Sequence, residues 1–117
     1  MAGLDHPVIA RLIEAIETPS EIFLVLEYGG ANSLYNYLLS KHEHRLKEYE
    51  AKKFLLVIAQ TLKHMHDRNI VHRDIKAENI LINRYKQIKL IDFGFSIHSV
   101  PPDTIDTFCG TPTYMAP

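Results

Sequence analysis

The chain has 117 residues, of which 46% are hydrophobic and 23% charged, and its net charge at pH 7 is −1. This length suits one domain rather than two, and the small charge gives no field that would draw the chain to nucleic acid or an anionic membrane. A single cysteine, Cys109, excludes an internal disulfide framework, and no apolar run approaches the ~20 residues of a membrane span. We therefore expect no nucleic-acid partner, no membrane span, and a cytoplasmic location with the nucleus as a second compartment.

The first predicted elements are two strands that form a hairpin. Residues 22–26 read Ile-Phe-Leu-Val-Leu, an apolar and partly β-branched run typical of a buried strand. Residues 12–16 are its predicted antiparallel partner, because the connecting loop is short. A glycine-rich turn follows, and a short helix is predicted over 34–40 with Asn32 or Ser33 as its N-cap.

The clearest helix is predicted over 48–67. Its apolar residues recur at a period near 3.6, which indicates one continuous buried stripe. The stripe consists of Ala51, Phe54, Leu55, Ile58, Leu62 and Met65. Lysine and glutamine side chains occupy the opposite face.

Short strands are predicted after this helix, at 70–71, 80–82 and 88–91. The last two flank a loop of hairpin length, so we expect them to pair. From Phe95 onward the apolar periodicity fails and prolines interrupt the chain, which predicts an irregular segment.

Three polar residues stand out around this hairpin: Asp74, Asn79 and Asp92. Asp74 ends a His-Arg-Asp triplet, Asn79 follows five residues later, and Asp92 begins Asp-Phe-Gly across the hairpin. Singly, each is an ordinary turn former. Together, at this spacing, they are the catalytic-loop and metal-loop signature of protein kinases.

Phosphoryl transfer explains why these residue types occur together. A carboxylate at Asp74 can orient a hydroxyl and accept its proton. Asp92 and Asn79 supply hard oxygen ligands to Mg²⁺, one from just before and one from just after the same hairpin. Lys76 can place a positive charge near the transferring group, and Gly94 is expected to let the backbone turn after the metal ligand.

The chain thus resembles the serine/threonine protein kinases, over essentially its whole length. Residues 72–79, with lysine at Lys76, look like the catalytic loop of that branch, and 109–117 resemble the end of the activation segment. In the family, the threonine matching Thr111 hydrogen-bonds the catalytic aspartate and lysine. Residues 4–9 resemble the loop that leaves the regulatory helix C. His72, Phe93 and Leu12 match the stacked hydrophobic spine, a structural role.

The resemblance also implies an ATP site. The segment matching the gatekeeper and hinge would hydrogen-bond adenine through its backbone, and Leu81 would pack beneath the ring. The matching segment is Leu26, Glu27, Tyr28 and Gly29. The implied cofactors are ATP and Mg²⁺, and the implied partners are protein substrates with serine or threonine hydroxyls. Glu78 matches a position that favours basic residues before the target hydroxyl in many relatives.

The implied fold is α+β, the two-lobed kinase fold with only its central part present. We expect residues 1–117 to form a partial kinase domain: an N-lobe remnant over 1–26, the hinge over 27–32, and part of the helical C-lobe over 33–117. The glycine-rich loop, strand lysine and helix C glutamate would lie before Met1, and further helices after residue 117. The chain alone is therefore expected to fold poorly and to be inactive; cooperative unfolding together with phosphotransfer by the isolated chain would refute this.

Three segments, 76–79, 92–96 and 105–110, resemble more closely one branch of the family, the AMP-activated and microtubule-affinity-regulating kinases. In that branch an upstream kinase phosphorylates the threonine matching Thr107. A phosphate there could pair with Arg73 and order the loop. The alternative is an exposed loop threonine with no regulatory role.

Two functions remain open at this point. The first is phosphoryl transfer from ATP to serine and threonine hydroxyls as part of a complete kinase domain. The alternative is a truncated or pseudokinase-like module that binds partners without catalysis. The intact set of Asp74, Lys76, Asn79 and Asp92 favours the first.

Overall fold

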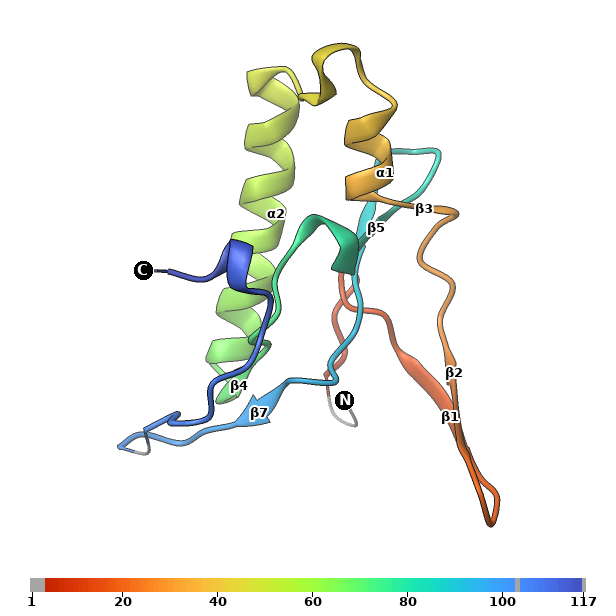
Figure 1. Ribbon diagram of the computed structural model, residues 1–117, viewed down its shortest axis with the longest axis vertical. Helices are drawn as coiled ribbons and strands as arrows, with labels where there is room; N and C mark the ends of the chain where they lie inside the picture. The colour runs from red at the N-terminus through yellow and green to blue at the C-terminus, as the bar shows by residue number, and fades with distance from the viewer. Residues whose placement is uncertain (1–3, 103, 117) are drawn as a thin grey trace.

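The computed structural model describes residues 4–102 and 104–116, and it contains both helices and small antiparallel sheets (Figure 1). The strands are β1 (Leu12–Glu17), β2 (Ile22–Leu26), β3 (Asn32–Ser33), β4 (Ile70–Val71), β5 (Ile80–Ile82), β6 (Ile88–Leu90) and β7 (Ile97–His98). The helices are α1 (Leu34–Leu39) and α2 (Glu48–His66), with single 3₁₀ turns η1 (His42–His44), η2 (Ala77–Asn79) and η3 (Pro112–Tyr114). The expected α+β class is confirmed.

The hairpin of β1 and β2 extends away from the rest of the chain (Figure 1). The two strands pair antiparallel from Leu12 opposite Leu26 to Glu17 opposite Ile22, as predicted. The expectation that β2 is buried is wrong, because all five of its side chains are exposed and Phe23 keeps 51% of its surface. In the part of the chain that the structure describes, β2 pairs with β1 alone, so both faces of the hairpin meet solvent.

Helix α1 begins after Ser33, whose hydroxyl accepts a hydrogen bond from the backbone N–H of Asn36 at 3.1 Å. This is the N-cap expected from the sequence. Ser33 also pairs with Leu81 in the sheet, so one serine both ends β3 and starts the helix.

Helix α2 ends at His66, one residue before the predicted end. Glu48 and Glu50 in its first turn suit the positive end of the helix dipole. Four residues of the predicted stripe are covered: Phe54 and Met65 are buried, and Ile58 and Leu62 are half-buried. Ala51 and Leu55 are exposed, and Leu55 keeps 67% of its surface. Val57 and Thr61 join the covered face in their place. The spacing of the covered positions follows the period of one helix face.

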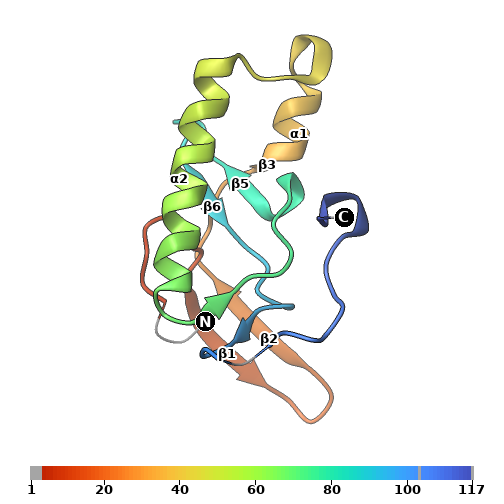
Figure 2. The ribbon, with the colours of Figure 1, turned by 90° about the vertical axis from the view of Figure 1, so that its left-hand side faces the viewer.

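The core forms where α2 packs on the hairpin of β5 and β6 (Figure 2). Ile80, Ile82, Ile88 and Leu90 are buried and alternate with half-buried Leu81 and Lys89, the period of a strand with one covered face. The first described segment runs beside β6, where the Leu90 N–H donates to the Val8 carbonyl at 2.7 Å. This packing fixes the hairpin that carries Asn79 and Asp92.

Strand β4 was predicted, but its partner β7 was not. Strand β7 has only two residues, too few for any periodicity to show. The rest of the segment after Phe95 is irregular, as expected, apart from η3, which begins with Pro112 in its first turn. No helix among the described residues is long and apolar enough to cross a membrane.

Candidate active site

The loop between β4 and η2 is built around the buried imidazole of His72. Its Nδ1 accepts the backbone N–H of Asp74 at 3.2 Å, and its Nε2 lies 3.1 Å from the Ile91 carbonyl. One neutral tautomer, protonated at Nε2, satisfies both contacts. Burial lowers the pKa of His72, which favours this neutral form. The ring also packs on Phe93, with centroids 4.8 Å apart, so two of the three predicted spine residues meet.

Asp74 has both carboxylate oxygens held by other side chains. Its Oδ1 accepts from the Thr111 hydroxyl at 2.6 Å, and its Oδ2 accepts from Asn79 Nδ2 and from Lys76 Nζ, each at 2.9 Å. The Thr111 bond, followed by those of Lys76 and Asn79, lowers the pKa of Asp74 although the residue is 4% exposed. The side chain is therefore an ionised carboxylate in a fixed orientation.

Asn79 is buried at the end of η2, and its amide group faces Asp74. The Nδ2 atom donates to both the backbone carbonyl and the Oδ2 of Asp74 at 2.9 Å. Both amide protons are then used, so Oδ1 is the atom left for a cation. The Asn79 carbonyl accepts the backbone N–H of Ile91 at 2.9 Å, which joins the two ends of the hairpin.

Asp92 follows Ile91 directly and adopts a left-handed backbone, with φ of 60°. The expected turn at Gly94 is present, since Gly94 and Phe95 form a turn in which the Ser96 N–H donates to the Phe93 carbonyl at 3.0 Å. Gly94 itself lies outside the left-handed region. A Cβ atom at Gly94 would lie 3.1 Å from Asp92 Oδ1, so the glycine leaves room for the carboxylate. The pKa of Lys76 is raised first by its bond to Asp74, and the charge of Asp92 adds to this. Asp92 directly follows Ile91, whose N–H bonds the Asn79 carbonyl, so it lies at the same end of the hairpin as Asn79.

The end of the activation segment is fastened to this loop, as the resemblance implied for Thr111. Lys76 Nζ donates to Thr111 Oγ1 at 2.8 Å. Gly110 has φ of 113°, and a Cβ atom there would lie 2.6 Å from the Arg73 carbonyl. Sequence reasoning missed a further link, in which the Tyr114 hydroxyl donates to Glu78 Oε2 at 3.1 Å. Both residues lie in segments that resemble the family, but no motif spacing relates one to the other, so the sequence did not indicate this pair.

Arg73 and Thr107, the predicted regulatory pair, share no hydrogen bond among the described residues. Arg73 Nε donates to the Phe95 carbonyl at 2.6 Å, and its Nη1 atom is buried with no hydrogen-bond partner among the described residues. Thr107 is exposed. Their proposed coupling remains a prediction.

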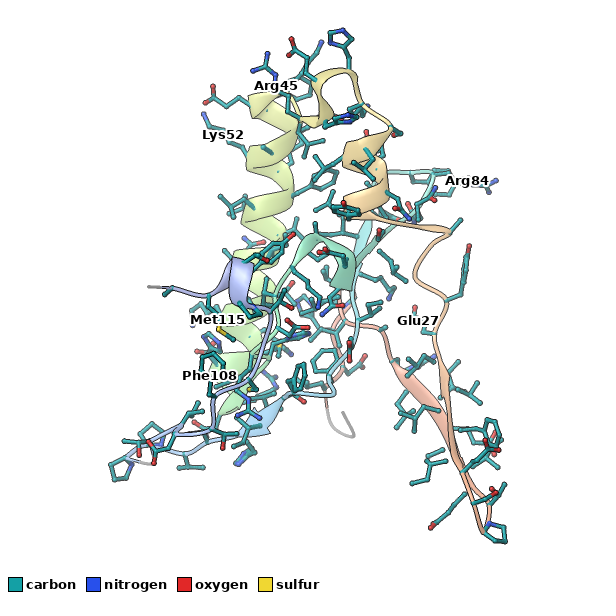
Figure 3. The ribbon with its side chains drawn as sticks, viewed as in Figure 1. Glu27, Arg45, Lys52, Arg84, Phe108 and Met115 are labelled. Carbon is teal, nitrogen blue, oxygen red and sulfur yellow. The ribbon has the colours of Figure 1, made fainter. Side chains whose placement is uncertain are left out.

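The predicted hinge runs from β2 to β3 and packs on β5. Gly29 is buried so closely that a Cβ atom there would lie 3.0 Å from Leu81 Cδ1, so two of the predicted adenine-site positions touch. Glu27 is anchored by an ion pair to Lys89 at 2.8 Å, whereas Tyr28 is 78% exposed. Leu26 is also exposed. Figure 3 shows Glu27 at the junction of the hairpin with the rest of the chain.

Comparison with known proteins agrees with these features. The protein kinase domain family matches residues 1–117. The chain is 40% identical over 117 residues to "Probable serine/threonine-protein kinase MARK-A" of Dictyostelium discoideum, covering 100% of this chain and 11% of that protein. It is 42% identical over 119 residues to "Serine/threonine-protein kinase DCLK3" of Homo sapiens, covering 98% and 18%.

A third relative is "Serine/threonine-protein kinase kin-29" of Caenorhabditis briggsae, 40% identical over 114 residues, covering 97% of this chain and 14% of that protein. The chain therefore spans less than a fifth of the length of each of these relatives. The match to MARK-A agrees with the finer resemblance to the microtubule-affinity-regulating branch.

Proposed function

The chain belongs to the protein kinase family, and from that premise we propose that the protein containing it transfers the γ-phosphoryl group of ATP to serine and threonine hydroxyls of protein substrates. One observation carries the proposal: the Asp74 carboxylate is buried, ionised and held by Thr111, Lys76 and Asn79. These three partners occupy positions of a phosphotransfer motif. A carboxylate with a purely structural role would not require partners at those positions.

In this proposal Asp74 orients the substrate hydroxyl and accepts its proton late in the reaction. A carboxylate has about four acceptor positions, and the three protein donors leave one for the substrate. Lys76 stays protonated because its bond to Asp74 raises its pKa. Its charge would stabilise the negative oxygens of the transferring group.

Asn79 Oδ1 and the Asp92 carboxylate are the residues that would hold Mg²⁺. Both are hard oxygen donors, the type that Mg²⁺ prefers, and they flank the same end of the hairpin. Mg²⁺ takes about six ligands, so phosphate oxygens of ATP and water would supply the rest. Bound Mg²⁺ would neutralise charge on the phosphates.

Adenine would lie at the hinge, with Leu81 against the ring and the backbone of 27–29 along its edge. The close approach of Gly29 to Leu81 supports this placement, because it puts an apolar side chain next to the hinge backbone.

We also propose that an upstream kinase acts on Thr107. The residue is exposed, and Arg73 has a buried Nη1 atom with no hydrogen-bond partner among the described residues. A phosphate would supply acceptor oxygens and about two negative charges for such a group. Phosphopeptide mass spectrometry of the protein purified from its own cells tests this, and a consistently unmodified, fully active Thr107 would refute it.

The reaction itself is tested with the complete protein, radiolabelled ATP and Mg²⁺ on a pool of unstructured protein substrates. Label is expected on phosphoserine and phosphothreonine after acid hydrolysis, and chelation of Mg²⁺ should abolish it. Nucleotide binding without any label would favour the binding module over the kinase. Label confined to phosphotyrosine would overturn the substrate class.

A further inference from the structure

Lys89 lies on the face of the β5–β6 hairpin that is turned away from the core. Its neighbours Ile88 and Leu90 are buried in the core, whereas Lys89 stands across the ladder from Leu81. The hinge packs on this second face, since a Cβ atom at Gly29 would lie 3.1 Å from Lys89 Cβ. Lys89 is thus a direct neighbour of the segment that would hold adenine.

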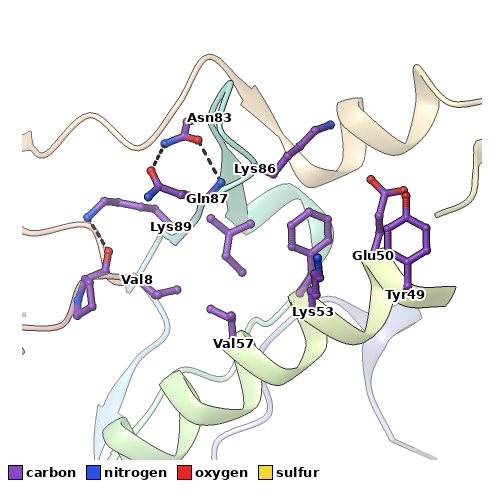
Figure 4. A pocket seen from close by; sticks show the side chains of 12 residues that line it. Val8, Tyr49, Glu50, Lys53, Val57, Asn83, Lys86, Gln87 and Lys89 are labelled. Carbon is purple, nitrogen blue, oxygen red and sulfur yellow. Dashed lines mark hydrogen bonds between the residues drawn. The ribbon is translucent and has the colours of Figure 1, made fainter. Parts of the chain in front are cut away.

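The ammonium group of Lys89 joins two segments that are distant in the chain. It lies 2.8 Å from Glu27 Oε1 in the hinge, and it donates to the Pro7 carbonyl at 2.9 Å. Figure 4 shows the Lys89 side chain reaching toward the chain at residues 7–8. Only 18% of the Lys89 side chain and 36% of the Glu27 side chain are exposed, so salt screens this pair less than it screens a surface pair.

Glu27 is also fixed by Arg11, the residue that precedes β1. Its Oε2 accepts the backbone N–H of Arg11 at 3.3 Å, and its own N–H donates to the Arg11 carbonyl at 2.8 Å. The bond to Lys89 is the largest cause of the lowered pKa of Glu27, so the carboxylate stays ionised and the pair stays charged. One ion pair therefore holds the hinge to the β5–β6 hairpin.

The groups around the proposed base are held independently of this pair. Thr111, Lys76 and Asn79 bond Asp74, and in the described part of the chain no hydrogen bond of Lys89 reaches any of them. Loss of the Lys89 ammonium group would therefore loosen the hinge and leave the proposed base in place.

We propose that Lys89 is a positioning residue for the nucleotide, which fixes the Glu27 carboxylate and with it the hinge backbone along which adenine would lie. The inference rests on the proposed function and adds to it a residue outside the catalytic and metal loops. A hinge that is already ordered binds ATP without a further loss of conformational entropy. Without the ion pair, that loss would weaken nucleotide binding and leave the rate of phosphoryl transfer at saturating ATP unchanged.

The test compares the complete protein with Lys89→Met, which keeps a long side chain and removes the charge. Isothermal titration calorimetry with ATP and Mg²⁺ should show an affinity about fivefold lower in the variant, in line with the strength of a partly exposed ion pair. The KM for ATP should rise with the loss of affinity, while kcat stays within about twofold. Lys89→Arg keeps the charge and should retain most of the affinity.

Glu27→Gln removes the other charge of the pair and should weaken ATP binding as Lys89→Met does. The double variant should lose little more than either single variant, because both remove the same interaction. Lys52→Met is the matched control, since Lys52 forms an exposed ion pair with Glu48 at 2.9 Å on α2 and should leave the affinity for ATP unchanged. Melting temperatures are measured in parallel, and if Lys89→Met does not fold, Glu27→Gln decides.

The outcomes separate this inference from the proposed function. Binding of ATP by Lys89→Met with an affinity equal to or higher than that of the wild type would overturn the inference alone. A fall in kcat at unchanged affinity, additive losses in the double variant, or equal losses in Lys89→Arg and Lys89→Met would overturn it as well. No binding of ATP by the wild-type protein would overturn the proposed function and this inference with it.

Discussion

Thr111 and Asp74 are 37 residues apart in the chain, yet the threonine hydroxyl donates to Asp74 Oδ1 at 2.6 Å. The hydroxyl oxygen, Thr111 Oγ1, accepts a hydrogen bond from Lys76 Nζ at 2.8 Å. A hydroxyl has one proton and two lone pairs, so it can bridge an anion and a cation in this way. A shift of the activation segment would therefore move Thr111 and change how the side chain that we propose as the catalytic base is held.

The first prediction concerns this bridge. Thr111→Val should lower kcat about 10- to 100-fold, because a hydrogen bond to a charged group is worth roughly 1.5–3 kcal/mol. Thr111→Ser keeps the hydroxyl and should retain most of the activity. Steady-state kinetics of the complete protein check both, and equal losses in the two variants would contradict a role for the hydroxyl.

The same substitution should change the pH dependence of the reaction. The Thr111 bond is the largest cause of the lowered pKa of Asp74, so its loss raises that pKa. A base must be ionised to work, so the acidic limb of the kcat/KM profile should move to higher pH in Thr111→Val. The control is Thr113→Ala, an exposed neighbour in η3 that should leave the limb in place. An unchanged limb in Thr111→Val would show that Asp74 does not control it.

The third prediction concerns the close approach of Gly110 to Arg73. Gly110→Ala would place a methyl group 2.6 Å from the Arg73 carbonyl, at a residue whose φ of 113° already disfavours a side chain. The activation segment must then shift, which loosens Thr111 from Asp74. We expect kcat to fall about tenfold or more, since such backbone strain costs of order 1–3 kcal/mol. Limited proteolysis should also cut the segment faster, and unaltered kinetics together with unaltered cleavage would contradict the prediction.

The fourth prediction is a loss of stability in mild acid. Burial, followed by the charges of His64, Arg68 and Lys89, lowers the pKa of His6, and burial lowers that of His72. The unfolded chain then binds more protons than the native one below about pH 6.5, so the free energy of unfolding should fall as pH decreases through that range. Denaturant titrations of the complete protein at pH 7.5 and 5.5 measure the effect.

His6→Asn provides the sharper comparison for this effect. An asparagine oxygen can replace Nδ1 as the acceptor for the Val8 N–H, which His6 now accepts at 3.2 Å, but it does not titrate. The pH dependence should therefore weaken in His6→Asn and persist in His42→Asn, an exposed position in η1. Equal pH dependence in both variants would exclude His6 as a source.

Much of the fold followed from local pattern alone. The period of α2, the alternation of Ile80 and Ile82 with Leu81, and the capping serine Ser33 are all properties of neighbouring residues. The edge of the covered face of α2, where Val57 is covered and Leu55 is exposed, could not be predicted in the same way. Leu55 fits the apolar period as well as Val57 does, and only the position of the β5–β6 hairpin decides which side is covered.

In the candidate site, too, the residues within a local motif could be predicted and the contacts between distant segments could not. Asp74, Asn79 and Asp92 were recognisable because the motif fixes their spacing. The bond of Tyr114 to Glu78 and the left-handed backbone at Asp92 depend on how distant segments meet, so sequence spacing carried no signal for them. The exposed β1–β2 hairpin is a case where a local pattern misled the prediction. The sequence of β2 is apolar, but an apolar strand is buried only where another segment covers it.

The most direct measurement compares γ-phosphoryl transfer by the complete protein with that of Asp74→Asn and Asp92→Ala at saturating ATP and Mg²⁺. Loss of the base should lower kcat by about 10²- to 10⁴-fold, and loss of the metal ligand should lower it strongly as well. Asp67→Asn, at the exposed end of α2, should keep the wild-type rate. Rates in Asp74→Asn and Asp92→Ala equal to the wild-type rate would contradict the assignment of these carboxylates to phosphoryl transfer.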